Sequence, residues 1–215
     1  MGSRLAQIFV GGERPNPRVA PHLSRDAETI AADSGWAHAV SLGFPPDVLV
    51  GDMDSIEPTD LEEARASSCD VIEFPVDKDL TDAEIAVQVA LERGCTEIVV
   101  VSGGGDRFDH VVAMLHSLAG VDADVTAFIG AARIRFCSPA RGCTLVVEPG
   151  RLVSLIPVGG DATGVHTEGL KWNLRDDTLH GFESRGVSNV AIASLVAVSV
   201  VRGRLAVVQP DYLED

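Results

Sequence analysis

Short apolar runs alternate with helical patterns along the first 130 or so residues. Most of the runs end at a glycine or an aspartate, and they predict strands at residues 6–10, 29–32, 48–50, 71–74, 98–101 and 125–129. The helical patterns between them predict helices at residues 36–42, 61–67, 82–93 and 109–118. Strands that alternate with helices and are apolar on both faces are typical of a parallel sheet covered by helices on each side.

Two of the helix starts carry the signature of a capping box. Thr59 with Glu62, and Thr81 with Glu84, have the spacing at which the two side chains bond to each other's backbone N–H groups. Gly94 and Gly120 stand where helices are expected to stop.

The pattern changes after about Arg133, where no amphipathic helix is convincing. Short β-like runs follow at residues 134–137, 144–147, 152–156, 193–201 and 205–208, separated by Gly, Pro and Asp turns. The sequence therefore predicts an α/β protein with an N-terminal parallel-sheet domain, residues 1–132, and a C-terminal all-β domain, residues 133–215.

Composition limits the partners and the location. A formal net charge of -15 over 215 residues argues against nucleic acid and anionic membranes, although a divalent metal could bridge local carboxylates to a nucleotide. No apolar run reaches the roughly 18 residues of a membrane span, and no signal peptide is visible, which predicts a cytoplasmic protein. The four cysteines lack CxxC spacing and are expected to be reduced and buried.

Acidic residues follow the third predicted strand, at the edge of the sheet where ligands usually bind. In extended chain Asp52 and Asp54 would face the same side, and two such carboxylates favour a hard divalent cation between them. The alternative is a polar turn in which Asp54 or Ser55 caps the next helix.

A second acidic cluster precedes the third predicted helix. Asp79 and Asp82 are spaced to approach each other on a first helical turn, and Lys78 offers a mobile charge for phosphate. The alternative is that these acids only complement the helix dipole.

A third cluster follows the fifth predicted strand, where Ser102 precedes three glycines and then Arg107 and Asp109. Glycines allow backbone N–H groups to approach phosphate, Arg107 could clamp phosphate oxygens, and Asp109 could complete a metal shell. The alternative is a plain glycine turn, since the segment matches no P-loop or Rossmann fingerprint.

Two further turns, Gly11-Gly12 and Asp33-Ser34-Gly35, would lie at the same edge, as pocket walls or as tight turns. Acids after three separate strands converge there, which predicts an enzyme that uses aspartate-held magnesium to move a phosphate-containing group from a nucleotide to a small molecule.

These motifs, in this order, resemble the thiamine pyrophosphokinase family over nearly the whole chain. The resemblance is carried by Ala32-Asp33-Ser34-Gly35, Pro46-Asp47, Gly51-Asp52-Met53-Asp54-Ser55, Asp77-Lys78-Asp79 with Thr81-Asp82, Gly104 with Arg107-Phe108-Asp109-His110, Gly169-Leu170-Lys171-Trp172 and Ser188-Asn189. It implies a β-sandwich as the second domain and a homodimer with active sites between subunits. It also implies that magnesium and ATP serve to transfer a diphosphate to the hydroxyl of thiamine, giving thiamine diphosphate and AMP.

The resemblance also implies roles for single residues. Metal and phosphates would be held by Asp52, Asp54, Asp82 and Asp109, with Lys78 and Arg107 neutralising phosphate charge. Substrate contacts would come from Asp33, Gly35, Asp77, Asp79, Thr81, Gly104 and His110, and on the thiamine side from Ser188 and Asn189.

After Asn189 the sequence runs Val190-Ala191-Ile192-Ala193, where the family pattern is more polar. This difference leaves open a diphosphokinase for another hydroxymethyl acceptor such as a pterin. A separate alternative is a non-catalytic sensor of nucleotide or thiamine built on the same fold.

Overall fold

The first part of the chain folds around a parallel sheet. A computed structural model describes residues 3–77, 79–105 and 107–214. Its first six strands are β1 (Leu5–Val10), β2 (Glu28–Ala32), β3 (Val48–Gly51), β4 (Asp70–Glu73), β5 (Glu97–Ser102) and β6 (Asp124–Ile129). They are ordered β6-β5-β1-β2-β3-β4, and all five neighbouring pairs are parallel. The α/β prediction is confirmed.

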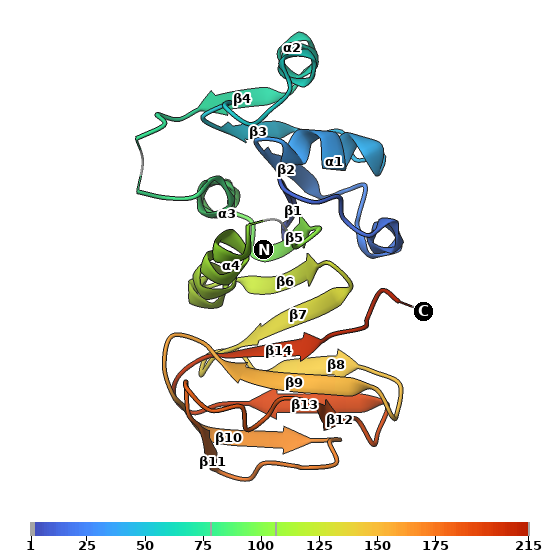
Figure 1. Ribbon diagram of the computed structural model, residues 1–215, viewed down its shortest axis with the longest axis vertical. Helices are drawn as coiled ribbons and strands as arrows, with labels where there is room; N and C mark the ends of the chain where they lie inside the picture. Colours follow the sequence, from blue (N-terminus) through green and yellow to red (C-terminus); the bar gives the residue numbers. More distant parts are fainter. Residues whose placement is uncertain (1–2, 78, 106, 215) are drawn as a thin grey trace. The chain divides into compact units, whose positions relative to one another are not determined.

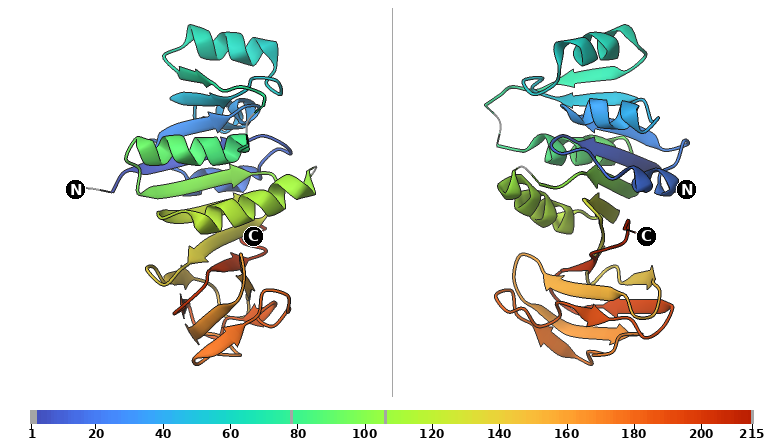
Figure 2. Two further views of the ribbon diagram at one scale, coloured as in Figure 1. Left: turned by 90° about the vertical axis from the view of Figure 1, so that its left-hand side faces the viewer. Right: turned by 45° about the vertical axis from the view of Figure 1, so that its right-hand side comes forward.

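Helices cover both faces of this sheet. They are η1 (Pro17–His22), α1 (Gly35–Ser41), α2 (Pro58–Ala66), α3 (Asp82–Glu92) and α4 (Phe108–Gly120). The four α-helices match the predicted ones, whereas the short 3-10 helix η1 was not predicted. Figure 1 shows α1 on one face of the strands and α3 on the other, and the two views of Figure 2 bring each of these helices to the front in turn.

The central strands are buried on both faces, as their continuous apolar runs predict. In β1 the residues from Ala6 to Phe9 are at most 1% exposed, and β3 is buried throughout. Helix α3 packs against β1, β2 and β3 through side chains that include Ile85 and Val89. Because packed strands and helices fix the ends of β1, β2 and β3, they also fix the loops that follow.

The second part of the chain is antiparallel. It contains β7 (Ala132–Cys137), β8 (Cys143–Val146), β9 (Leu152–Pro157), β10 (Ala162–Glu168), β11 (Asp177–Leu179), β12 (Asn189–Val190), β13 (Leu195–Ser199) and β14 (Leu205–Gln209). Two arrays, β12-β9-β14-β7 and β11-β10-β13-β8, enclose one apolar core that draws residues from both, such as Leu155, Val207, Leu145 and Val196. The all-β prediction is confirmed. Strands β10, β11 and β12 were missed because their sequences are short or interrupted by polar residues and glycine.

Two compact units divide the chain. Residues 1–114 and 123–130 form the first, and residues 115–122 and 131–215 form the second. The boundary expected between residues 132 and 133 stays a prediction. Within the described residues, no helix is long and apolar enough to cross a membrane.

One of the two expected capping boxes is present. At α3 the Thr81 hydroxyl accepts from the backbone N–H of Glu84, and the Glu84 carboxylate accepts from the backbone N–H of Thr81. The box expected at Thr59 is wrong, because α2 begins one residue earlier at Pro58, whose fixed φ suits a first helical position. Thr59 therefore lies inside the first turn.

Candidate active site

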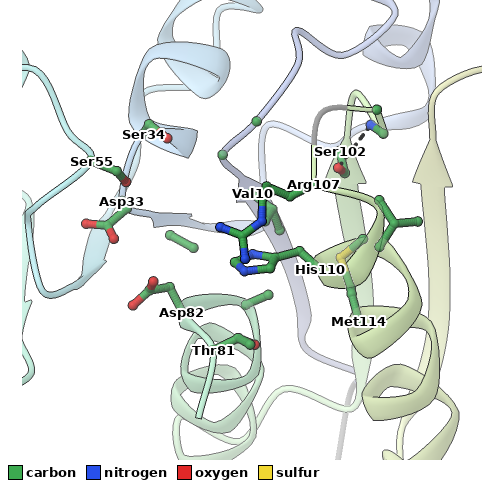
Figure 3. A pocket seen from close by; sticks show the side chains of 17 residues that line it. Val10, Asp33, Ser34, Ser55, Thr81, Asp82, Ser102, Arg107, His110 and Met114 are labelled. Carbon is green, nitrogen blue, oxygen red and sulfur yellow. Dashed lines mark hydrogen bonds between the residues drawn. The ribbon is translucent and has the colours of Figure 1, made fainter. Parts of the chain in front are cut away.

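A cavity of about 460 Å³ lies in the first unit, where the carboxyl ends of β1, β2 and β5 meet the starts of α3 and α4. This is the edge at which open α/β sheets bind ligands. It is lined by Val10, Gly11, Gly12, Ala32, Asp33, Ser34, Ser55, Thr81, Asp82, Ala83, Ser102, Gly104, Gly105, Arg107, His110, Val111 and Met114. Figure 3 shows carboxylates on one side of this cavity and the side chain of Arg107, the residue before α4, projecting into it.

Asp33 is placed by a strained turn directly after β2. Its φ is 47°, in the left-handed region, and its backbone N–H donates to the carbonyl of Val50 at 2.9 Å. Its Oδ1 accepts from the backbone N–H of Met53 at 3.0 Å, so the buried side chain is tied to the chain that follows β3. A Cβ on Gly51 would lie 2.4 Å from that same Oδ1, and Gly51 has φ 151°. Glycine is therefore required where Asp33 crosses the end of β3.

Asp82 is placed by the start of α3. The capping box at Thr81 fixes where the helix begins, and Asp82 is its first residue. One of its carboxylate oxygens, Oδ1, is buried. A carboxylate here also benefits from the positive end of the helix dipole.

Three carboxylates from three different elements form an acidic group. Asp33, Asp52 and Asp82 each offer an oxygen, and these oxygens all lie within 4.8 Å of one another. Burial, followed by the charges of Asp82 and Asp52, raises the pKa of Asp33 from 3.8 to about 7. Hard oxygen ligands held so close together can bind a divalent cation, which would offset their mutual repulsion.

Asp54 lies outside this group. Met53 has φ 62°, so the chain is not extended there, and the expectation that Asp52 and Asp54 face the same point is wrong. The backbone N–H of Asp54 instead donates to Oδ1 of Asp52 at 3.3 Å, and the Asp54 side chain is exposed. Its assignment as a metal ligand stays a prediction.

The glycine-containing loop after β5 supplies the opposite wall. Ser102 Oγ accepts from the backbone N–H of Gly104 at 3.2 Å, which folds the loop back over the strand end. Arg107 lines the cavity and donates to Asp109 through Nε at 3.0 Å and Nη2 at 2.7 Å. That contact lowers the pKa of Asp109 to about 2. Asp109 therefore lies against Arg107 and not within the acidic group.

The acids before α3 lie further out. Asp77 and Asp79 are exposed and do not line the cavity, and Lys78 lies outside the described residues. The expected pairing of Asp79 with Asp82 on a first helical turn is wrong, because the helix begins only at Asp82. Their roles in substrate binding stay predictions.

The residues expected on the thiamine side lie in the second unit. Asn189 is buried and its amide bridges backbone groups, with Oδ1 accepting from Trp172 and Val190 and Nδ2 donating to the Trp172 carbonyl. Ser188 is exposed in the left-handed region with φ 59°, and its N–H donates to Ser154 Oγ. Asn189 thus holds the loop around Trp172, while Ser188 presents its side chain outward.

The cavity lining differs in part from the predicted residues. Gly11 and Gly12, offered as pocket walls or as a tight turn, line the cavity, whereas the predicted Gly35 is buried and does not line it. Val111 and Met114 were missed, although Met114 follows Val111 by three residues and His110 by four, the spacings of neighbours on a helix surface. Ser34, from the turn offered as a pocket wall, and Ser102, from the third cluster, also line the cavity.

The parallel sheet with its acid-lined cavity, joined in one chain to an antiparallel β unit, suits a transferase of the kinase type. Two family models match. Residues 20–129 match "Thiamin pyrophosphokinase, catalytic domain", and residues 143–205 match "Thiamin pyrophosphokinase, vitamin B1 binding domain". The chain belongs to the thiamine pyrophosphokinase family, and its activity is that of a thiamine diphosphokinase.

Comparisons with curated relatives and with solved structures give the same family. Thiamine pyrophosphokinase 1 of Oryza sativa subsp. japonica is 25% identical over 85% of this chain and 79% of its own, and the Bacillus subtilis enzyme is 24% identical over 96% and 98%. The crystal structure of thiamine pyrophosphokinase from Bacillus subtilis has a TM-score of 0.79 at 22% identity, over 96% of this chain and 98% of that one. That from Candida albicans has a TM-score of 0.77 at 13% identity, over 95% and 89%.

Proposed function

We propose that the cavity at the carboxyl edge of the parallel sheet is where this enzyme transfers the terminal diphosphate of ATP to thiamine. In that reaction the hydroxyl oxygen of thiamine bonds to the β-phosphorus, and the bond from that phosphorus to the α,β-bridging oxygen breaks. AMP leaves and the hydroxyl proton is released. The observation that carries the proposal is the convergence of Asp33, Asp52 and Asp82 on one point of the cavity wall.

The acidic group fits Mg2+. It supplies oxygen ligands only, and the pKa of Asp33, raised to about 7 by burial and by its two neighbours, reflects a repulsion that a cation would remove. Asp33, Asp52 and Asp82 would hold the metal, with Asp54 close in sequence as a further candidate. When bound, the metal supplies charge neutralisation for the transferring phosphates.

Other residues of the cavity bind and orient ATP. Backbone N–H groups of the loop containing Gly104 and Gly105 suit phosphate oxygens, and the Arg107 guanidinium projects into the same space. Helix α4 begins directly after Arg107, and its first N–H groups add positive potential. Phosphoryl-type transfer relies on positioning and charge stabilisation, so this set of groups needs no covalent nucleophile.

The second unit takes the thiamine side, a role supported by the vitamin B1 binding model over residues 143–205. Ser188 and Asn189 stand within that range and are our candidates for contact with thiamine. A homodimer with active sites shared between subunits belongs to the same proposal. Light scattering would measure the assembly, and activity recovered on mixing two inactive variants, one altered in each unit, would support shared sites.

The decisive assay mixes the protein with ATP, MgCl2 and thiamine and separates the products. We expect AMP and thiamine diphosphate in equal amounts, whereas ADP would assign ordinary kinase chemistry. A hydroxymethylpterin assayed in parallel tests the other acceptor, and faster turnover of the pterin would move the function to that alternative. Binding of both substrates without any product would leave only a sensor.

A further inference from the structure

Arg107 and Asp109 form a two-point contact at the start of α4. Nε donates to Oδ1 at 3.0 Å and Nη2 donates to Oδ2 at 2.7 Å, so the flat guanidinium and the flat carboxylate meet edge to edge. Arg107 lines the cavity, whereas Asp109 does not. Figure 3 shows the Arg107 side chain directed toward the middle of the cavity.

This contact does little for stability. The two side chains are 64% and 65% exposed, and ion pairs in such positions contribute little because water and salt screen them. Its consequence is geometric. Arginine has a long side chain with many rotamers, and a contact through two parallel hydrogen bonds fixes both the position and the plane of its charged group.

The Asp109 carboxylate lies in the first turn of α4, where the backbone N–H of His110 adds to the effect of Arg107 in lowering its pKa. The contact with Arg107 uses two of the five guanidinium donors, both on the Nε–Nη2 edge. The Arg107 guanidinium is therefore held along its Nε–Nη2 edge against the first turn of α4.

We propose that Asp109 is a positioning residue, which acts through Arg107 and does not bind the metal: its carboxylate holds the guanidinium in the orientation that reaches the transferring phosphates. The inference rests on the proposed function, because it assigns Arg107 to the phosphates of ATP. It replaces the metal role that the family resemblance implies for Asp109. The acidic group made by Asp33, Asp52 and Asp82 supports it, since Asp109 is not part of that group.

The test measures kcat, KM for ATP and the magnesium concentration at half-maximal activity. We expect Asp109→Asn to lower kcat/KM for ATP by about threefold to tenfold, the scale set by freeing one long side chain. The magnesium midpoint stays within about twofold of wild type. In an Arg107→Lys background, where the ammonium cannot make the two-point contact, Asp109→Asn has less than about a twofold further effect.

The matched control is Asp60→Asn, the same substitution at another aspartate in the first turn of a helix. It should leave kcat/KM and the magnesium midpoint at wild-type values, and thermal melts of all variants confirm that they are folded. A tenfold rise in the magnesium midpoint of Asp109→Asn would overturn the proposal in favour of a metal ligand. Effects of Arg107→Lys and Asp109→Asn that simply multiply would overturn it as well. A wild-type protein that makes no AMP would refute the proposed function instead.

Discussion

Gly35 lies directly against a strand of the sheet at the start of α1, and replacing it with alanine should disturb both the fold and the site. The residue is buried at the start of the helix. An added Cβ would lie 2.1 Å from the carbonyl oxygen of Phe9 and 2.6 Å from its carbonyl carbon. Both are backbone atoms of β1, a central strand that pairs with β2 on one side and β5 on the other.

The size of the effect follows from that geometry. Restoring an ordinary contact of 3.4 Å requires α1 and β1 to move apart by about 1.3 Å, and the paired strand cannot yield easily. Overpacking of this kind costs about 1–3 kcal/mol, less a few tenths that alanine regains in a helix. At about 2–4 °C per kcal/mol for a chain of this size, the melting temperature should fall by about 1–11 °C. The displacement also moves Ser34 and Asp33, so KM for ATP should rise.

Gly120→Ala provides the control, because it makes the same chemical change at a helical glycine that is exposed instead of buried. Gly120 is the exposed last residue of α4, and its added Cβ would meet nothing within 4 Å. We expect it to be neutral or to stabilise by up to about 1 kcal/mol. Differential scanning calorimetry and ATP titration would compare the two proteins. A Gly35→Ala protein with the melting temperature and KM of wild type would show that α1 is not held against β1 as described.

The remaining predictions concern the metal, a buried histidine and the loop around Trp172. Asp82→Asn should lower turnover by about two orders of magnitude and raise the magnesium requirement while the melting temperature stays within a few degrees; full activity would remove Asp82 from the site. Burial lowers the pKa of His38, whose Nδ1 lies 3.1 Å from the Val10 carbonyl, so the unfolded chain binds a proton more readily and stability should fall as pH drops through 6.5. His38→Gln should flatten that slope in urea titrations between pH 7 and pH 5, and equal slopes would contradict the assignment. Asn189→Ala leaves the N–H groups of Trp172 and Val190 and the Trp172 carbonyl without the side chain that pairs them, and should cost about 1–3 kcal/mol by chemical denaturation.

Much of the fold could be predicted from the sequence, because the patterns that indicate its strands and helices are local or periodic. The continuous apolar runs of β1, β2, β3 and β5 stand in the sequence itself, and the capping box at Thr81 and Glu84 fixed the start of α3 to the residue. Strand β10 could not be predicted from the sequence. Its alternation is broken by polar residues and by Gly164 in the left-handed region, where the register against β11 shifts.

The sequence predicted that acids would gather at the carboxyl edge of the sheet, but of the four expected metal ligands only Asp52 and Asp82 belong to the acidic group, which Asp33 completes. That acids after several strands converge follows from parallel topology alone. Which carboxylates meet depends on single backbone angles. Left-handed turns at Asp33 and Met53 bring Asp33 into the acidic group and take the chain out of the extended form that would have aligned Asp54 with Asp52. Non-glycine residues adopt such angles only where the surrounding structure imposes them, so the local sequence does not predict them.

The acidic group lowers the stability of the metal-free fold above about pH 4. Burial and two neighbouring carboxylates raise the pKa of Asp33 from 3.8 to about 7. Between these two pH values the Asp33 carboxyl keeps its proton in the folded, metal-free protein, whereas the same group has lost it in the unfolded chain. By linkage, stability in this state falls as pH rises from about 4 through 7. The carboxylate is held in place against that repulsion by the Met53 N–H, which donates to its Oδ1, while the Asp33 backbone N–H donates to the Val50 carbonyl. Such local destabilisation is expected of a group that could bind a cation, because a cation bound there would offset the repulsion among the three carboxylates.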